Sequence, residues 1–226
     1  MTQAVEIGAR FRVRLNGWGR LGEALAQHED VPLFVFGGID GEEVEAEIVR
    51  RHRRYMAARV VQVIEPSPHR IAPPCPHFGP CTGCQWQHIT AEHQRELKRL
   101  AVIDALERIG DLTDAPVSDV VPAPAPLGYR NHARFTVGPQ GTLGYVNRES
   151  RRFVPIDRCP LMDEGINTTL AQLQGHCADT TQVSVRYGTG TGDLLVQPGQ
   201  PVEECRLPDV GGAANRDRTA RSRLGS

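Results

Sequence analysis

The sequence predicts an α+β protein: a small N-terminal β-barrel, a cysteine-rich loop plus one helix, a mixed α/β domain, and a disordered C-terminal tail. Three observations give this prediction. Short apolar runs alternate with Gly- and Pro-rich turns over residues 1–64. A stretch without periodicity follows and contains three cysteines. After it come a helical pattern and then further strand-like and helical segments. The tail, residues 198–226, has no apolar period.

The first 64 residues read as short strands. Phe11, Val13 and Leu15 alternate with arginines, which is the period of a half-buried strand. The prolines after Glu65 end the pattern, because a central strand does not tolerate them. Closure of such short strands into a barrel is the expected arrangement. The further strands are expected at residues 31–36, 44–49 and 59–64.

Residues 65–110 combine the cysteine-rich loop with a helix that we expect from Thr90, as N-cap, to Gly110, just past its end. Its apolar stripe consists of Leu97, Leu100, Val102, Ile103, Leu106 and Ile109. Residues 111–197 form the predicted mixed α/β domain, with a helix at 163–174. Its strands are expected at residues 132–137, 142–146, 153–156, 182–187 and 193–197.

Composition excludes several classes of protein. The 226 residues are 39% hydrophobic and 23% charged, which suits one or two packed domains. No apolar run approaches the roughly 18 residues of a membrane-spanning helix. The first residues show no basic segment followed by an apolar one, so no secretory signal is visible. We therefore expect a cytoplasmic protein without a membrane partner, and exclude collagen, coiled coil and secreted disulfide-rich folds.

The formal net charge of −1 conceals an uneven distribution. Residues 128–158 contain six arginines against Glu149 and Asp157, a local excess of six minus two, or +4. The abundance of arginine along the whole chain can equally reflect a GC-rich genome. An acidic run at residues 40–47 is followed by basic residues 50–54, which can pair with it across a hairpin. A balanced total therefore does not exclude a nucleic-acid-binding face.

The cysteines give the strongest chemical signal. Cys75, Cys81 and Cys84 can converge on one centre from a tight loop, and Cys159, followed by Pro160, is the best candidate for a fourth ligand. Disulfides are disfavoured in a reducing compartment. Four-cysteine zinc sites commonly present two CxxC pairs, and here there is one. Spacing alone does not separate zinc from an iron–sulfur cluster.

The run Cys75-x5-Cys81-x2-Cys84-Gln-Trp-Gln-His88 resembles the iron–sulfur signature of the S-adenosylmethionine (SAM)-dependent RNA uracil-C5 methyltransferases, which modify 23S rRNA and tRNA. Thr82 stands where the signature usually has glycine. Further similarities follow in the family's order. Residues 1–64 are similar to its TRAM domain, an OB-like RNA-binding barrel, with residues 16–19 and 41–44 at the usual places. Residues 128–131 are similar to the motif that opens its central domain, and residues 159–161 are similar to the site of its fourth cluster ligand.

This resemblance implies a [4Fe-4S] cluster held by Cys75, Cys81, Cys84 and Cys159. It also implies RNA, either rRNA or tRNA, as the partner of the barrel and of the central domain. The RNA-contacting residues would be Tyr129, Arg130, Asn131 and Arg134, whose arginine and aromatic mixture suits phosphates and bases. Without the resemblance, these residues read as a solvated strand face with the tyrosine packed inward.

The chain departs from the family where catalysis is expected. The family's catalytic domain, with its SAM loop, cysteine nucleophile and carboxylate base, follows the central domain, whereas 29 residues follow Gln197 here. Two features could be mistaken for parts of a catalytic site, and we reject both. The glycines at 188, 190 and 192 lie between strands and predict a hairpin turn. Cys205 follows Glu203 and Glu204, which disfavour its thiolate. We therefore expect no catalytic residues and no SAM binding by this chain.

Three functional hypotheses remain. The first is an RNA-binding, cluster-containing N-terminal part of an RNA uracil-C5 methyltransferase, inactive alone. The second is an independent RNA-binding module whose iron–sulfur or zinc centre is structural or redox-sensing. The third is a split enzyme, in which a separate catalytic chain docks on residues 198–226.

Overall fold

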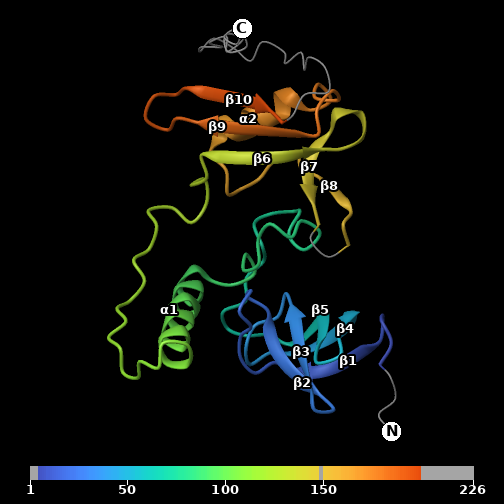
Figure 1. The fold of residues 1–226 in the computed structure, drawn as a ribbon, viewed down its shortest axis with the longest axis vertical. Helices are drawn as coiled ribbons and strands as arrows, with labels where there is room; N and C mark the ends of the chain where they lie inside the picture. The colour runs from blue at the N-terminus through green and yellow to red at the C-terminus, as the bar shows by residue number, and fades with distance from the viewer. Residues whose placement is uncertain (1–4, 148–149, 200–226) are drawn as a thin grey trace, which may run out of the picture. The chain divides into compact units, whose positions relative to one another are not determined.

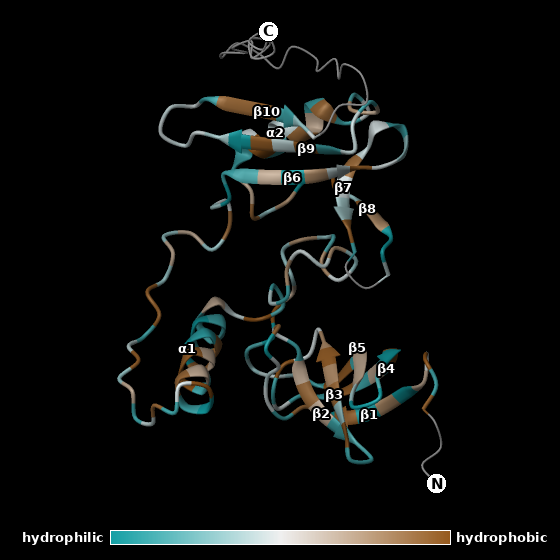
Figure 2. Cartoon of the chain, in the orientation of Figure 1, coloured by the Kyte–Doolittle hydropathy of each residue, from teal (hydrophilic) through white to brown (hydrophobic). Residues whose placement is uncertain are grey.

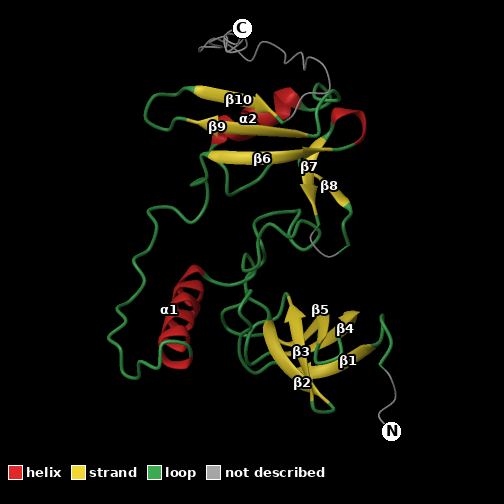
Figure 3. Cartoon of the chain, in the orientation of Figure 1, coloured by secondary structure: helices red, strands yellow, loops and turns green. Residues whose placement is uncertain are grey.

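The structure is a computed structural model that describes residues 5–147 and 150–199 (Figure 1). The chain divides into two compact units. The first comprises the residues up to 79 together with 84–123, and the second comprises residues 80–83 together with those from 124 onward. Strands dominate both units, as Figure 3 shows. Most of the tail for which we expect disorder, residues 200–226, lies outside the described residues.

The first unit contains a sheet of five strands with the order β1-β4-β5-β3-β2. β3 and β5 run parallel, and the other neighbours are antiparallel. The end strands β1 and β2 also approach each other. Side chains that alternate along the strands, such as Val44, Ala46 and Ile48, form the core. The strands are β1 (Arg10–Arg14), β2 (Ala24–His28), β3 (Val31–Phe36), β4 (Glu43–Arg51) and β5 (Met56–Glu65).

Strand β2 is missing from the sequence prediction, and two local features explain why. Its residues, Ala-Leu-Ala-Gln-His, have low β propensity. The turn that joins it to β3 has Glu29 and Asp30 at φ 45° and 66°, where hairpins usually carry Asn-Gly. Tertiary pairing with β3 therefore determines this strand, and the other four strands of the sheet confirm their predictions.

The helix of the first unit, α1, spans Ala91–Arg108 and follows Thr90, whose side chain makes no capping hydrogen bond. The prediction that the apolar residues of this helix form one buried face is wrong. Leu97 is buried, whereas Leu100, Val102 and Ile109 are exposed. Apolar residues spaced by three drift by about 60° per step around a helix of 3.6 residues per turn, so they do not stay on one face.

The second unit has a fully antiparallel sheet with the order β10-β9-β6-β7-β8. One α-helix, α2 (Glu164–Leu173), buries Ile166, Leu170 and Leu173 in the core of this sheet. The predicted strands and helix are confirmed. The strands are β6 (His132–Val137), β7 (Leu143–Val146), β8 (Phe153–Pro155), β9 (Gln182–Tyr187) and β10 (Leu194–Pro198), with a 3-10 turn at Pro139–Gly141.

The glycine-rich segment between β9 and β10 is a hairpin turn, as predicted. Gly188 donates its N–H to the carbonyl of Asp193 at 2.8 Å, and Gly192 donates to the carbonyl of Gly188 at 2.7 Å. Figure 2 shows the apolar positions of both sheets along the strands. Neither α1 nor α2, the α-helices of the described chain, combines the length and apolar character that crossing a membrane requires.

Candidate functional site

The cysteine loop, residues 72–87, is closed at its base by backbone pairing. Arg70 and Ile89 form an antiparallel bridge. Ile71 donates its N–H to the carbonyl of His88 at 3.0 Å, and Thr90 donates to the carbonyl of His69 at 2.9 Å. The segments before and after the loop therefore lie side by side, although residues 80–83 are assigned to the second unit.

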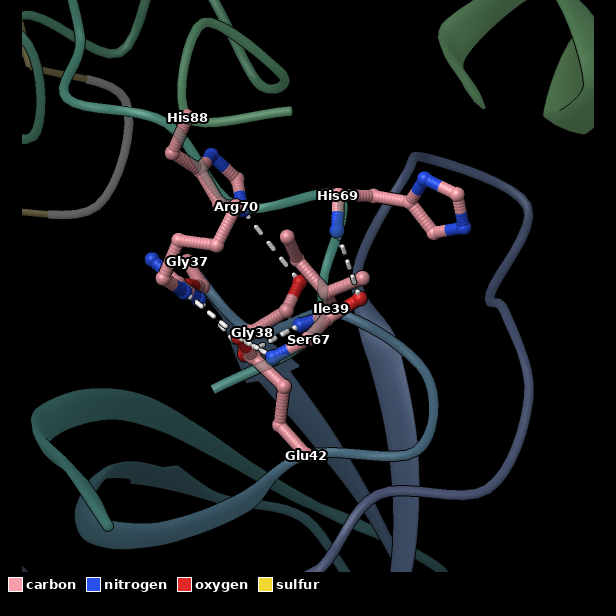
Figure 4. A network of polar contacts seen from close by, with 8 residues as sticks. All are labelled: Gly37, Gly38, Ile39, Glu42, Ser67, His69, Arg70 and His88. Carbon is pink, nitrogen blue, oxygen red and sulfur yellow. Dashed lines mark hydrogen bonds and ion pairs between the residues drawn. The ribbon is translucent and has the colours of Figure 1, made fainter. Parts of the chain in front are cut away.

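A buried ion pair lies beneath this base (Figure 4). Glu42 is fully buried, and its two carboxylate oxygens accept hydrogen bonds from Arg70 Nε at 2.5 Å and Nη2 at 2.6 Å. The N–H groups of Ile39, at 2.9 Å, and Ser67, at 3.1 Å, donate to the same carboxylate. Arg70 Nη2 also donates to the carbonyl of Gly37 at 2.8 Å. The pair thus ties the loop base to the sheet.

The Glu42 carboxyl remains ionised despite its burial. Burial acts to raise the pKa of this group, but the hydrogen bonds from Arg70 and Ser67, the charge of Arg70 and the Ile39 N–H together hold the pKa below its usual value. A buried charge is tolerated when it is paired and its lone pairs are satisfied. The four donors to Glu42 meet that condition.

His88, the last residue of the cysteine signature, is buried in the same network (Figure 4). Its Nε2 lies 3.3 Å from the carbonyl of Gly38, so this nitrogen carries the proton. Burial lowers the pKa of the imidazole to about 4, which makes the ring neutral at pH 7. Its Nδ1 is buried without a hydrogen-bond partner among the described residues.

Trp86 anchors the far side of the loop on the first unit. Its indole N–H donates to the carbonyl of Gly22 at 2.9 Å, and its ring meets Trp18 edge to face at 6.0 Å. Gly22 has a φ of 89°, and a Cβ at this position would lie 2.7 Å from Trp86 Nε1. Glycine at position 22 thus allows the backbone to approach the indole. Ile39, Ile89 and Leu97 form the small core beneath the two indoles.

Of the four predicted metal ligands, Cys75 and Cys84 lie in the first unit. Gln87 Nε2 donates to Cys84 Sγ at 3.1 Å, which is a hydrogen bond suited to a thiolate. Cys81 and Cys159 lie in the second unit and pack against its core. The short segment that carries Cys81 is held there by Asn147, whose Nδ2 donates to the carbonyl of Pro80 at 2.8 Å.

Cys159 is positioned by α2. The side chain of Asn167, a buried residue of that helix, accepts the Cys159 N–H at 2.9 Å and donates to the Cys159 carbonyl at 3.2 Å. Burial and the nearby Cys81 raise the pKa of the Cys159 thiol. The N–H groups of Leu161 and Met162 and the charge of Arg130 oppose that shift. The net shift is upward, so the neutral thiol is favoured, although these N–H groups and the Arg130 charge act toward the thiolate.

The structure leaves the metal prediction open. Within residues 5–147 and 150–199, no three His, Cys, Asp or Glu side chains lie close enough together to hold one metal ion. The assignment of Cys75, Cys81, Cys84 and Cys159 as a ligand set therefore stays a prediction.

The predicted RNA-contacting residues lie along an extended segment that pairs with the Cys159 region. Arg130 donates its N–H to the carbonyl of Leu161 at 2.8 Å, and the Asp163 N–H donates to the Arg130 carbonyl at 2.8 Å. The two sequence motifs, residues 128–131 and 159–161, are thus neighbours in the second unit. Tyr129 is 55% exposed, so the alternative of an inward-packed tyrosine is wrong.

Arg134 differs from the other RNA candidates. Its guanidinium donates to the side-chain carbonyl of Gln182 on the neighbouring strand, with Nε at 2.9 Å. The basic excess of this region is also reduced, because Arg158 forms a two-point ion pair with Glu164 at 2.6 and 2.8 Å. Arg130, Arg151 and Arg152 remain exposed, and Arg148 lies outside the described residues.

Sequence reasoning missed Glu42, Arg70 and Asn167 as positioning residues. A signal for Glu42 was present, because it precedes Val44, Ala46 and Ile48 at the spacing of two that defines the inward face. A charged residue at an inward position requires a buried partner. Nothing in the sequence near Arg70 or Asn167 marks them as the partners of Glu42 and Cys159.

Comparison with known proteins gives this geometry a context. No family model matches the chain. It is 35% identical over 216 residues to the 23S rRNA (uracil(1939)-C(5))-methyltransferase RlmD of Alkalilimnicola ehrlichii, across 90% of this chain and 48% of that protein. It is 38% identical over 182 residues to an uncharacterized RNA methyltransferase of Gloeobacter violaceus, across 73% of this chain and 40% of that protein.

A solved structure shares the fold. The tRNA (uracil-54, C5)-methyltransferase of Pyrococcus abyssi, in complex with S-adenosyl-L-homocysteine, aligns with a TM-score of 0.57 at 21% identity. The alignment covers 88% of this chain and 47% of that one. The chain thus spans about half the length of the relatives it matches. Two of the proteins it resembles are RNA uracil-C5 methyltransferases, and others are uncharacterized RNA methyltransferases.

Proposed function

We propose that this chain is the RNA-binding, [4Fe-4S]-containing N-terminal part of a SAM-dependent RNA uracil-C5 methyltransferase that acts on rRNA or tRNA. The observation that carries the proposal is the 35% identity to RlmD along 90% of the chain. Methyl transfer would require the half of the relatives that this chain does not span. The chain alone would therefore bind RNA without methylating it.

The first unit would serve as an OB-like RNA-binding barrel of the TRAM type. Its sheet order, its parallel β3–β5 pair and the approach of β1 to β2 support this proposal. OB-like barrels are five-stranded and bind oligonucleotides with a strand face and adjoining loops.

The second unit would supply a further RNA contact. The exposed Tyr129 offers a ring on which a base can stack, and the neighbouring Arg130 and Asn131 offer donors to phosphates and base edges. Arg134 would join them by exchanging its bond to Gln182 for one to RNA. The pairing of this segment with residues 160–163 supports a fixed rather than a free backbone here.

The [4Fe-4S] cluster would be held by Cys75, Cys81, Cys84 and Cys159. The proximity of Cys81 to Cys159 and the N–H donors around both Cys159 and Cys84 support this donor set, because N–H groups directed at sulfur stabilise ligating thiolates. The alternative is a four-cysteine zinc site, which would use the same thiolates. Measuring the iron and zinc contents of the purified chain distinguishes the two.

The proposed function is tested with the purified 226-residue chain. It is titrated with uracil-containing rRNA and tRNA fragments, and methyl transfer from SAM is assayed on the same samples. We expect saturable binding and no methylated RNA. Absence of binding would reject the RNA-binding role, whereas methylated uracil would reject the assignment of catalysis to the part of the relatives that this chain does not span.

A further inference from the structure

The arginines on the outer face of the first sheet are neutralised by glutamates. Arg14 Nη2 lies 2.6 Å from Glu65, and Arg59 Nη2 lies 2.9 Å from Glu47, which also pairs with Arg10 at 3.2 Å. Arg12 pairs with Glu43, which also lies 3.7 Å from Arg14, and Arg10 reaches Glu45 at 4.0 Å. The glutamates that follow Asp40 are therefore engaged by β1, β5 and Arg70, which goes against the alternative that they pair with residues 50–54.

A second group of arginines has no such partner among the residues that the structure describes. The arginine cluster, defined as Arg50, Arg51, Arg53 and Arg54, lies at the end of β4 and in the turn to β5, and all four residues are exposed. Within the described part of the chain, none of the four forms an ion pair; Arg51 makes one long hydrogen bond, 3.5 Å, to the carbonyl of Val5. Figure 2 shows the end of β4 as hydrophilic.

The turn that carries this cluster is ordered by aromatic contacts. His52 donates its N–H to the carbonyl of Tyr55 at 2.9 Å, and the two rings stack with centroids 4.4 Å apart and planes 17° apart. Tyr55 in turn meets Phe34 of β3 edge to face at 5.3 Å. A planar ring stack anchored on the sheet thus lies among four unneutralised guanidinium groups.

We propose that the arginine cluster and the His52–Tyr55 stack bind single-stranded RNA, the cluster through backbone phosphates and the exposed His52 face through a base. The inference rests on the proposed RNA-binding function and locates a contact surface on the first unit. Arginine forks match phosphate oxygens, and aromatic rings beside them accept unpaired bases. Loops of this kind in OB-like barrels contact oligonucleotides.

Other anionic partners fit these observations less well. A membrane-binding loop requires apolar side chains that insert, whereas residues 50–54 contain none, and Tyr55 packs on Phe34. An acidic peptide would satisfy the guanidinium groups but would make no use of the stacked rings.

The test compares two triple variants of the full chain that remove the same charge. One is Arg50→Gln/Arg53→Gln/Arg54→Gln, and the other is Arg10→Gln/Arg12→Gln/Arg14→Gln. Affinity for a single-stranded uracil-containing RNA is measured over a range of salt. We expect the cluster variant to bind about tenfold or more weakly, and its salt slope to fall by about 2, because each neutralised phosphate of a single strand adds about 0.7 to that slope. The control variant should change far less.

Equal losses of affinity in both variants would show that net charge alone matters and would overturn the inference. An unchanged cluster variant, with a wild-type chain that binds RNA, would overturn the inference and leave the proposed function intact. A wild-type chain that binds no RNA would overturn both. His52→Ala should weaken binding of the RNA several-fold and leave binding of an abasic strand of the same length unchanged; equal effects on both strands would reject the stacking contact.

Discussion

Arg70 donates two parallel hydrogen bonds to the fully buried carboxylate of Glu42, from Nε at 2.5 Å and Nη2 at 2.6 Å. Glu42 lies just before β4, and Arg70 lies at the start of the cysteine loop. Two segments separated by 28 residues are thereby held together at the base of the loop.

Glu42→Gln should destabilise the first unit. The substitution leaves the Arg70 guanidinium partly buried without a counter-charge, which costs about 3 kcal/mol in comparable pairs. Urea unfolding followed by tryptophan fluorescence measures the change, because Trp18 and Trp86 lie in this unit. Glu43→Gln, at an ion pair on the outer face, is the matched control and should cost far less, because water screens that pair. Equal effects would contradict a structural role for the buried pair.

His88 should make the stability of the first unit depend on pH. Its folded-state pKa is about 4, below the ordinary 6.5, so the unfolded chain binds more protons between these values. Stability is then fully present above pH 6.5 and falls by up to about 1.4 kcal/mol per pH unit as pH decreases toward 4. The lowered pKa of Glu42 adds a loss in the same direction at still lower pH.

Urea unfolding at a series of pH values checks this expectation. His88→Gln keeps a donor for the Gly38 carbonyl and should flatten the profile, whereas His52→Gln, at an exposed histidine, should leave the slope unchanged. A wild-type profile that is flat from pH 6.5 to 5 would contradict the burial of a neutral imidazole.

Cys159→Ser should abolish the visible absorbance of an anaerobically purified chain, because it removes one of the four proposed cluster ligands. Cys177→Ala is the control, since Cys177 is buried in the core of the second unit and is not one of the proposed ligands. Iron, sulfide and zinc contents are measured in parallel. Colour that survives in Cys159→Ser would reject Cys159 as a ligand, and a colourless wild-type chain with bound zinc would reject the cluster.

Asn167→Ala should destabilise the second unit by about 2 kcal/mol. It removes the side chain that bonds both backbone groups of Cys159 and leaves the Cys159 N–H without its acceptor, whereas the carbonyl keeps the Met162 N–H. Thr168→Ala, at the adjacent exposed position of α2, should be nearly neutral. Thermal unfolding of the two variants decides the matter, and similar melting temperatures would show that Asn167 does not position Cys159.

The strand pattern was predictable where alternation and turn residues agreed, as in β6 and β9. β2 was not, because its sequence has no β preference and pairing with β3 determines it. The burial of α1 was overestimated, because spacing by three resembles a stripe in the sequence but winds around the helix. The inward register of Glu42 could have been read from β4, whereas its partner Arg70 depends on a tertiary contact.

For the candidate site, the sequence indicated which types of residue take part and in which order their motifs follow along the chain. The resemblance matched residues 128–131 to the motif that opens the family's central domain and residues 159–161 to its fourth ligand site, and backbone hydrogen bonds bring these two segments together. Which arginines are available to an anionic partner could not be read from the sequence. That property depends on which glutamates the strand register places beside them, as for Arg12 opposite Glu45 and beside Glu43.

Residues 80–83 belong to the second unit, although the chain on both sides of them belongs to the first. The chain leaves the first unit after Gly79, returns at Cys84 and leaves again after Ala123. A fragment ending at residue 123 would therefore carry Cys81 without the core on which it packs, and a fragment starting at residue 124 would lack Cys81. No single cut in the chain therefore separates the two units cleanly.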